Sequence, residues 1–373
     1  MTTRLIRVGV DGRVLANPPM RGWTRYAGNL LRALAARDDV ELVVFTREPP
    51  CPRHLAGVRG RVVRFDASRE VLWNDWHLPR QLRAARIDVF HALADRGLPV
   101  VKPCPLVVTL HNSYERAHWR ALFPTVKRRL WYWKHELVNA HRAAAVVTVS
   151  DTTRMELLQF GVCASEKLVR VHLAPAPEFR AEAQPDDASV LARHGVRAPF
   201  LLCVGGYDPH KNVDLLVRAF EASGLATHQL VVAAEQREAT APLRAPWARL
   251  GCADRLRLIE PRSDELPALY RGAQLLVQPS RWESFAFPLV EAMASGLPIL
   301  ATRCGAMPEV VADAAVFFAA DDVAEAADLL RRVSADAGLR ASLRSRGLRR
   351  AAAFSWTRTA EETVAVYRRV LAA

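Results

Sequence analysis

The chain has 373 residues, of which 50% are hydrophobic, and a formal net charge of +13 at pH 7. This length corresponds to about two domains, and the apolar content is enough for two hydrophobic cores. The positive charge suggests an anionic partner, but no recognition-helix, RNP or zinc-finger pattern accompanies it, so we do not expect that partner to be nucleic acid.

The six cysteines form no C-x-x-C pair, and none lies near a matching pair of histidines. We therefore expect reduced thiols and no zinc site. The sequence enters an apolar β-type run at once, without the apolar segment of a signal peptide, and no apolar run approaches the ~20 residues that span a bilayer. These features predict a cytoplasmic protein.

Apolar runs bounded by turn residues alternate with amphipathic stretches along the chain, which is typical of parallel β/α units. In the first half we expect strands at 4–11, 40–46, 61–65, 87–92, 106–111, 144–149 and 169–173. In the second half we expect strands at 200–204, 230–234, 256–259, 275–278, 299–302 and 315–318.

A stretch rich in Pro, Ala and Asp at 174–189 separates the two halves, and each half opens on a strand followed by a turn. We therefore expect an α/β protein with two doubly wound Rossmann-like domains, at 1–180 and 190–355, and a last amphipathic helix at 356–373. Ligands of such sheets bind outside the carboxyl ends of the strands, so the sequence predicts a cleft shared by the domains.

Three positions in the first half follow predicted strands. Gly22 lies just before an expected helix at 27–36 and is a candidate turn residue. His111 stands at the end of its strand, where a polar side chain would face a ligand, although a lone histidine there can equally be a structural hydrogen-bond partner. Ser150 follows the next strand and is expected to cap a helix.

The second half begins with the string VGGYDPHKN, which ends at Asn212, between a predicted strand and a predicted helix. Its adjacent glycines, Gly205 and Gly206, form a turn after the strand. Lys211, just before the helix, would put a positive charge beside a pyrophosphate. A glycine turn with an exposed lysine is common, so the whole string carries more information than its parts.

The segment 280–309 combines two carboxylates, a helix start and two glycine-marked turns. Pro288 predicts the start of a helix that runs to Ser295, with Gly296 as its stop. Backbone N–H groups of the preceding loop and of the first helical turn would face a phosphate. Glu283 would lie beside that anion, and Glu291, in the first turn, would accept hydrogen bonds from sugar or ribose hydroxyls. The alternative is an ordinary strand–loop–helix unit with solvated acids.

This segment resembles the E-x7-E region of the retaining glycosyltransferases of family GT4, whose fold, GT-B, has two doubly wound Rossmann-like domains facing across a cleft. The resemblance implies that Glu283 lies by the donor sugar and that Glu291 holds the nucleotide ribose. The loop usually reads G-F-G in that family and reads S-F-A here. The other implied donor-binding residues of this segment are Ser284, Phe285, Ala286, Phe287 and Leu289.

Other strings are similar to the same family. The loop with Gly22 resembles one that closes over the donor phosphates, and His111 matches a histidine that contacts the donor sugar, with Asn112 where an aspartate is usual. The family's lysine at the position of Lys211 neutralises the leaving diphosphate. The resemblance also implies donor contacts from Gly205, Gly206 and Asn212, and base contacts from Pro261 and Arg262.

The resemblance implies a retaining hexosyltransferase that moves a sugar from a UDP- or GDP-linked donor to an acceptor hydroxyl. Its catalytic residues would be Glu283, His111 and Lys211, its first domain would bind the acceptor, and its last helix would return to that domain. No cofactor is implied, and since no D-x-D string is present, we expect no metal. The expected pathway is lipid-linked or surface glycan assembly. Glycosylation of a small natural product and a non-catalytic nucleotide-sugar-binding protein are the alternatives.

The segment 116–142 mixes tryptophans with many basic residues. Helical spacing predicts a core-facing stripe, with the basic residues outside. Two hypotheses stand for that outer face: a solvated helix surface, or peripheral docking on an anionic membrane at its inner face. The residues expected in the stripe are Phe123, Val126, Leu130, Leu137 and Val138.

Overall fold

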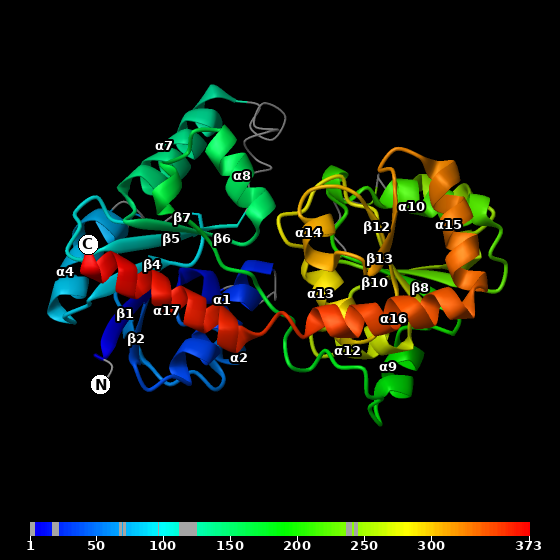
Figure 1. Ribbon diagram of the computed structural model, residues 1–373, viewed down its shortest axis with the longest axis horizontal. Helices are drawn as coiled ribbons and strands as arrows, with labels where there is room; N and C mark the ends of the chain where they lie inside the picture. Colours follow the sequence, from blue (N-terminus) through cyan, green and yellow to red (C-terminus); the bar gives the residue numbers. More distant parts are fainter. Residues whose placement is uncertain are drawn as a thin grey trace. The chain divides into compact units, whose positions relative to one another are not determined.

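The computed structural model describes residues 4–16, 22–66, 69, 72–95, 97–111, 125–235, 241 and 245–373, with the backbone alone at 128 and 131–137. The chain divides into two compact units (Figure 1), one formed by Met1–Leu173 with Ser355–Ala373 and the other by Ala174–Phe354. Each unit is built around one parallel β-sheet.

The first unit contains a seven-stranded parallel sheet in the order β3-β2-β1-β4-β5-β6-β7. Its central strands are buried along their whole length, as expected for a parallel sheet covered by helices on both faces. The strands are β1 (Ile6–Asp11), β2 (Val40–Thr46), β3 (Arg61–Arg64), β4 (Val89–Ala92), β5 (Leu106–Leu110), β6 (Ala145–Thr148) and β7 (Leu168–Arg170).

Helices lie on both sides of this sheet (Figure 1), with α7 and α8 on one side and α1, α2 and α17 on the other. Ser150 caps α8, because its side chain accepts a hydrogen bond from the Thr153 backbone N–H, as expected. The helix expected at 27–36 begins earlier, at Gly22. The helices are α1 (Gly22–Ala35), α2 (Pro52–Leu55), α4 (Leu78–Ala84), α7 (Val126–Arg142), α8 (Asp151–Gln159) and α17 (Trp356–Ala372), with a π-helical turn at Trp73–His77.

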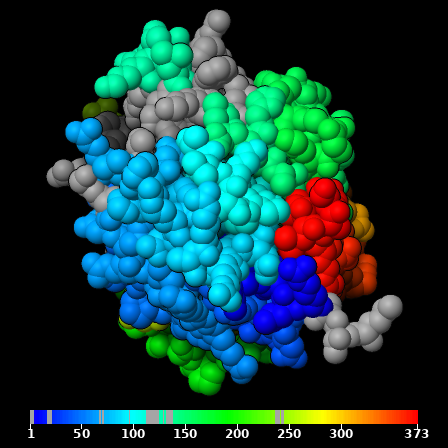
Figure 2. Space-filling view, turned by 90° about the vertical axis from the view of Figure 1, so that its left-hand side faces the viewer, coloured from blue at the N-terminus to red at the C-terminus, as the bar shows by residue number. Residues whose placement is uncertain are grey.

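The last helix, α17, belongs to the first unit although it follows the second unit in the sequence. It packs against α1, and in the space-filling view its red surface lies beside the blue N-terminal segment (Figure 2). Ser355 caps it by accepting a hydrogen bond from the Arg358 backbone N–H. Its inward face carries the buried side chains of Ala360, Val364 and Tyr367.

The second unit contains a six-stranded parallel sheet in the order β10-β9-β8-β11-β12-β13. Its strands are β8 (Phe200–Val204), β9 (Gln229–Ala233), β10 (Leu256–Ile259), β11 (Leu275–Gln278), β12 (Ile299–Thr302) and β13 (Ala315–Phe318). Its helices are α9 (Asp187–Arg193), α10 (Val213–Ser223), α12 (Leu266–Gly272), α13 (Phe287–Ala294), α14 (Met307–Val311), α15 (Val323–Ala335) and α16 (Ala337–Ala351).

All the expected strands are present, and each lies in the sheet of its own half. The order β9-β8-β11 places β8 where the winding of the second sheet reverses. The loops that follow β8 and β11 therefore flank the position where doubly wound sheets bind ligands. This adjacency of two sequence-distant loops is what builds the site described below.

The expected stripe on α7 is wrong. Val126, Leu130 and Val138 are exposed, at 66%, 61% and 36% of their surface. The buried positions of the described part of α7 are Asn139 and Ala140, which are offset from that stripe around the helix. Phe123 lies outside the described residues, as does the side chain of Leu137.

Candidate active site

A lysine and a glutamate meet at the carboxyl edge of the second sheet. Lys211 comes from the loop after β8 and Glu283 from the loop after β11, and the lysine Nζ donates to Glu283 Oε1 at 2.7 Å. The two side chains are 72 residues apart in sequence. The parallel order of their strands brings these two predicted site residues into direct contact.

Glu283 is held by more than the lysine. Its Oε1 also accepts hydrogen bonds from Ser280 Oγ at 2.7 Å and from Gln278 Nε2 at 3.0 Å, and the residue is only 8% exposed. Hydrogen bonds to an ionised carboxylate are short and strong. This set of donors fixes the orientation of the carboxylate.

The backbone of Glu283 is fixed as well. Its carbonyl oxygen accepts a hydrogen bond from the Ala306 N–H at 2.8 Å. Gly305 lies against the same backbone with φ of +55°, and a Cβ there would overlap Glu283 atoms. Only glycine fits such a position without strain. The glycine turn expected in this segment therefore has a defined role in holding Glu283.

Lys211 ends a short 3₁₀ turn at Pro209–Lys211, and its side chain stays 23% exposed. The next residue, Asn212, has φ of +55°, a conformation that asparagine tolerates better than most residues. Its amide donates to the carbonyls of Pro279 at 3.1 Å and Ala320 at 2.8 Å. Asn212 thus ties three loops together, a structural role that differs from the predicted donor contact.

The glycine pair before this turn has an accessible backbone. Gly205 is exposed and Gly206 half-buried, and a Cβ on Gly205 would approach only the Lys211 stem, at 3.8 Å. The N–H of Gly205 donates to the Ala233 carbonyl at 3.1 Å. A ligand can therefore come close to the main chain beside Lys211.

Helix α13 starts one residue earlier than expected, at Phe287, so Glu291 lies beyond its first turn. Ala286 precedes the helix with φ of +61°, a backbone region in which glycine is usual. Phe285 and Leu289 are buried, at 2% and 0% exposure, so neither presents a side chain to a donor. Ser284 and Phe287 lie in the same loop and helix start.

Glu291 is fully buried, and its Oε2 accepts a hydrogen bond from the Tyr270 hydroxyl at 2.9 Å. Tyr270 lies on α12 and is not among the site residues predicted from the sequence. Pro261 and Arg262 follow β10, and the Arg262 guanidinium donates to Asp264 Oδ2 at 3.0 Å.

His111 belongs to the first unit, at the end of β5. Its Nε2 lies 2.9 Å from the Leu93 carbonyl oxygen, which can only accept, so Nε2 carries the proton and Nδ1 keeps the lone pair. Burial lowers the pKa of His111 to about 4, so the ring is neutral at pH 7. The ring of Tyr26 packs edge-on against it, with centroids 4.7 Å apart. Asn112 lies outside the described residues.

The chain is similar to known proteins over most of its length. Residues 20–174 match the family described as Glycosyltransferase Family 4, and residues 192–350 match glycosyl transferases group 1. The chain is 34% identical to a D-inositol 3-phosphate glycosyltransferase of Salinispora arenicola, over 94% of this chain and 88% of the relative. The chain belongs to the family 4 (GT4) glycosyltransferases.

A second relative of this GT4 glycosyltransferase is the MMP alpha-(1->4)-mannosyltransferase of Mycolicibacterium hassiacum, 31% identical over 78% of the chain and 74% of the relative. Among solved structures, Anabaena HepE in complex with UDP and glucose matches with a TM-score of 0.76 and 16% identity, covering 97% of this chain and 99% of that one. The fold is GT-B, and the protein is a glycosyltransferase, as the sequence predicted.

A buried hydrogen-bonded chain supports the histidine of this GT4 enzyme. Tyr26 OH lies 2.9 Å from Thr109 Oγ1, which lies 2.8 Å from His91 Nε2, and His91 Nδ1 lies 2.8 Å from the Tyr367 hydroxyl. Burial, together with the nearby His111, lowers the pKa of His91 to about 3, and burial raises the pKa of both phenols. These four hydrogen-bonded side chains are therefore neutral at pH 7. They connect α17 to the Tyr26 ring, which packs on His111.

In the part of the chain that the structure describes, no three His, Cys, Asp or Glu side chains come together as a set of metal ligands. All six cysteines are free thiols, as expected. Within the same described ranges, no helix has both the length and the apolar composition needed to cross a bilayer.

Proposed function

We propose that this GT4 enzyme is a retaining hexosyltransferase that uses a UDP- or GDP-linked sugar. The contact of Lys211 with Glu283 carries the proposal, because it joins a cation for the leaving diphosphate to a carboxylate for the sugar at one sheet edge. UDP and glucose are bound by the structural neighbour HepE, and one relative is named as a mannosyltransferase. We assign nucleotide-sugar binding to the second unit and acceptor binding to the first.

In this proposal the diphosphate lies beside Lys211, the accessible backbone of Gly205 and Gly206, and the N-terminus of α13. These groups offset the charge that develops on the leaving group. Glu291 accepts hydrogen bonds from the ribose, and the Nδ1 lone pair of His111 accepts one from a sugar hydroxyl.

Retention of configuration is proposed to follow front-face substitution. The acceptor oxygen forms its bond to the anomeric carbon on the side where the bond to the diphosphate oxygen breaks, and the acceptor proton passes to the departing phosphate. Glu283 is not the nucleophile in this scheme, because the acceptor oxygen attacks the anomeric carbon directly; the three hydrogen bonds to its Oε1 hold it in place. It positions the sugar.

A thermal-shift screen tests the proposed donor class. UDP or GDP should raise the Tm of the wild-type protein by mass action, and the matching nucleotide-sugar should do so as well. Glu291→Ala should weaken binding of the same nucleotide by about 1 to 3 kcal/mol, through loss of charge-assisted hydrogen bonds. Absence of stabilisation by either nucleotide would contradict the donor class, and an unchanged Kd in the variant would remove Glu291 from the ribose site.

We expect transfer to proceed without a divalent metal, because Lys211 and backbone dipoles meet the charge of the diphosphate. Activity measured after treatment with EDTA and removal of the chelator should equal that of the untreated enzyme. Loss of activity that Mg²⁺ or Mn²⁺ restores would show that the diphosphate needs an ion.

We propose that the acceptor belongs to lipid-linked or surface glycan assembly, and that α7 makes a peripheral contact with the membrane. The exposed apolar side chains of Val126 and Leu130 lie one helical turn apart, next to the exposed Lys127. Apolar side chains beside basic ones suit the interface of an anionic bilayer, where each basic residue contributes about 1 kcal/mol. A location on the inner face of the membrane stays a prediction.

Vesicle co-sedimentation tests this contact. Wild-type protein should bind vesicles that contain anionic lipid, less at high salt, and a double variant with Val126→Ser and Leu130→Ser should bind several-fold less. A matched control changes two exposed leucines elsewhere, Leu5→Ser and Leu348→Ser, and should bind like wild type. Equal binding by all three proteins, or by none, would favour a small soluble acceptor.

A further inference from the structure

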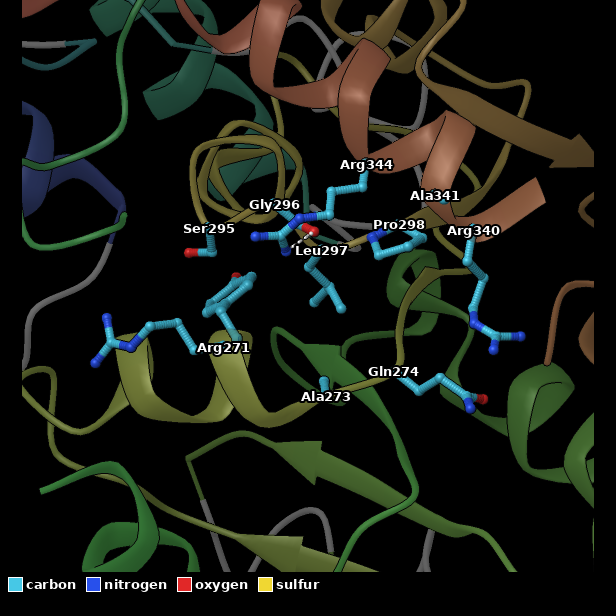
Figure 3. Close-up of a pocket in the computed structure, with 11 residues that line it drawn as sticks. Arg271, Ala273, Gln274, Ser295, Gly296, Leu297, Pro298, Arg340, Ala341 and Arg344 are labelled. Carbon is cyan, nitrogen blue, oxygen red and sulfur yellow. Dashed lines mark hydrogen bonds between the residues drawn. The ribbon is translucent and has the colours of Figure 1, made fainter. Parts of the chain in front are cut away.

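A pocket of about 220 Å³ opens at the amino-terminal ends of β11 and β12, on the edge of the second sheet opposite Lys211 and Glu283. Figure 3 shows the residues that line it. Its walls are the end of α12, the turn between α13 and β12, and one side of α16. None of the residues in the catalytic proposal lines it. The pocket is smaller than the ~300 to 1,000 Å³ typical of drug-sized ligands, so it suits a small molecule or one group of a larger molecule.

Two arginines of α16, Arg340 and Arg344, lie one helical turn apart on the pocket wall. Like charges at this spacing repel each other. Arg340 Nη1 donates to the Val333 carbonyl at 2.8 Å, and Arg344 Nη1 donates to the Gly296 carbonyl at 2.8 Å. Across the described residues, their side chains bond only backbone carbonyls and neither pairs with a carboxylate.

The opposite wall differs in charge. Arg271 also lines the pocket, but its guanidinium is paired with Asp187 at 2.5 and 2.8 Å. The net positive charge of the pocket therefore comes from α16. Guanidinium groups present several N–H donors in a fixed plane, the geometry that binds phosphate oxygens.

The remaining lining includes polar groups with hydrogen-bonding capacity left. The Ser295 hydroxyl is buried, the residue being 2% exposed, and it has no hydrogen-bond partner among the described residues. Gln274 accepts from His228 Nε2 through its Oε1 at 3.0 Å, which leaves its amide N–H groups as donors. Arg340 and Gln274 extend toward the same side of the pocket (Figure 3).

The pocket is connected to Glu291 by two direct links. Tyr270 forms part of the wall, and its hydroxyl donates to Glu291 Oε2 at 2.9 Å. Ser295 and Gly296, also in the wall, end the helix α13 that carries Glu291. A ligand that fixed these residues would restrict the position of the buried carboxylate.

We propose that this pocket binds a phosphate group, from inorganic phosphate or a small phosphomonoester, and that the bound anion pre-organises Glu291 for the nucleotide. Phosphate binding stands on the pocket alone, whereas the effect on nucleotide affinity rests on the proposed function. The anion and the nucleotide occupy opposite edges of the sheet, so they do not compete for one site. Because the bound anion pre-organises Glu291, each should strengthen the binding of the other.

Calorimetric titration with inorganic phosphate, and separately with glycerol phosphate, tests the binding. Wild-type protein and Lys211→Met should bind at the pocket, and a double variant with Arg340→Gln and Arg344→Gln should bind at least ~10-fold more weakly. The matched control removes two exposed arginines nearby, with Arg331→Gln and Arg349→Gln, and should keep wild-type affinity. Equal affinity in the pocket variant and the control would overturn the proposal. Binding of only one of the two ligands identifies the source of the phosphate.

Nucleotide affinity with and without phosphate tests the connection. Phosphate should tighten binding of UDP or GDP by roughly 5-fold or more in the wild type and should have no such effect in the pocket variant. In Tyr270→Phe, phosphate should still bind while its effect on the nucleotide is lost. If phosphate instead competed with the nucleotide at Lys211, it would weaken nucleotide binding in every variant. That result would refute the connection. If no nucleotide binds at all, the donor assignment fails while the phosphate titration still decides the pocket.

Discussion

Glu283→Gln should lower the rate of sugar transfer by about 10²- to 10³-fold, the loss expected when one well-placed polar group is removed from a transition state. The variant keeps the size of the side chain but loses its charge. A glutamine amide presents N–H donors where the carboxylate accepts hydrogen bonds. The variant would therefore lose hydrogen bonds from the sugar hydroxyls and the ion pair with Lys211. Nucleotide affinity should change little, because the carboxylate is assigned to the sugar.

The measurement is kcat with the donor found in the screen, together with the Kd of the free nucleotide. Gln278→Ala is an informative companion, since it removes one hydrogen bond to Glu283 while leaving its charge. We expect it to lower kcat by a smaller factor. Turnover close to that of the wild type in Glu283→Gln would exclude this carboxylate from the mechanism.

Lys211→Met should weaken nucleoside diphosphate binding by about 1.5 to 3 kcal/mol, roughly 10- to 150-fold, through loss of a charged hydrogen bond. The rate of transfer should fall further than binding does, because the charge on the diphosphate grows as the bond to the sugar breaks. Methionine preserves the apolar stem of the side chain, so the 3₁₀ turn that carries it should remain.

Lys211→Arg serves as the control, because it keeps the positive charge next to Glu283. It should bind the diphosphate better than Lys211→Met does. Lys211→Met should also unfold at a lower temperature, since Glu283 loses its cation at a position that is 8% exposed. An unchanged Kd for the nucleoside diphosphate in Lys211→Met would move the phosphate site elsewhere.

The parallel sheets were predictable because their strands are short, continuous apolar runs bounded by turn residues. The strands at 40–46, 200–204, 256–259, 275–278, 299–302 and 315–318 match the sequence prediction residue for residue. Glycine and proline marked the ends of α13 to within one residue, since the backbone limits of these residues act locally.

The contacts that define the site could not be predicted in the same way. The pairing of Lys211 with Glu283 depends on β8 and β11 being neighbours, and strand order is a property of the whole sheet. The same is true of Tyr270 and its contact with Glu291. For α7, helical spacing gave a stripe but not the side that packs on the sheet, which is why Val126 and Leu130 were placed inward.

The first unit is interrupted in the sequence, and this bears on how the protein is made. During synthesis the residues up to Leu173 leave the ribosome long before α17. Until α17 is made, His91 lacks its hydrogen bond to Tyr367, and the face of α1 that packs against α17 stays uncovered. Residues 174–354 form the uninterrupted second unit, which can complete its core first. The usual order, in which the N-terminal domain folds first, is therefore reversed at this step, because α17 completes the first unit only after residues 174–354 have been made.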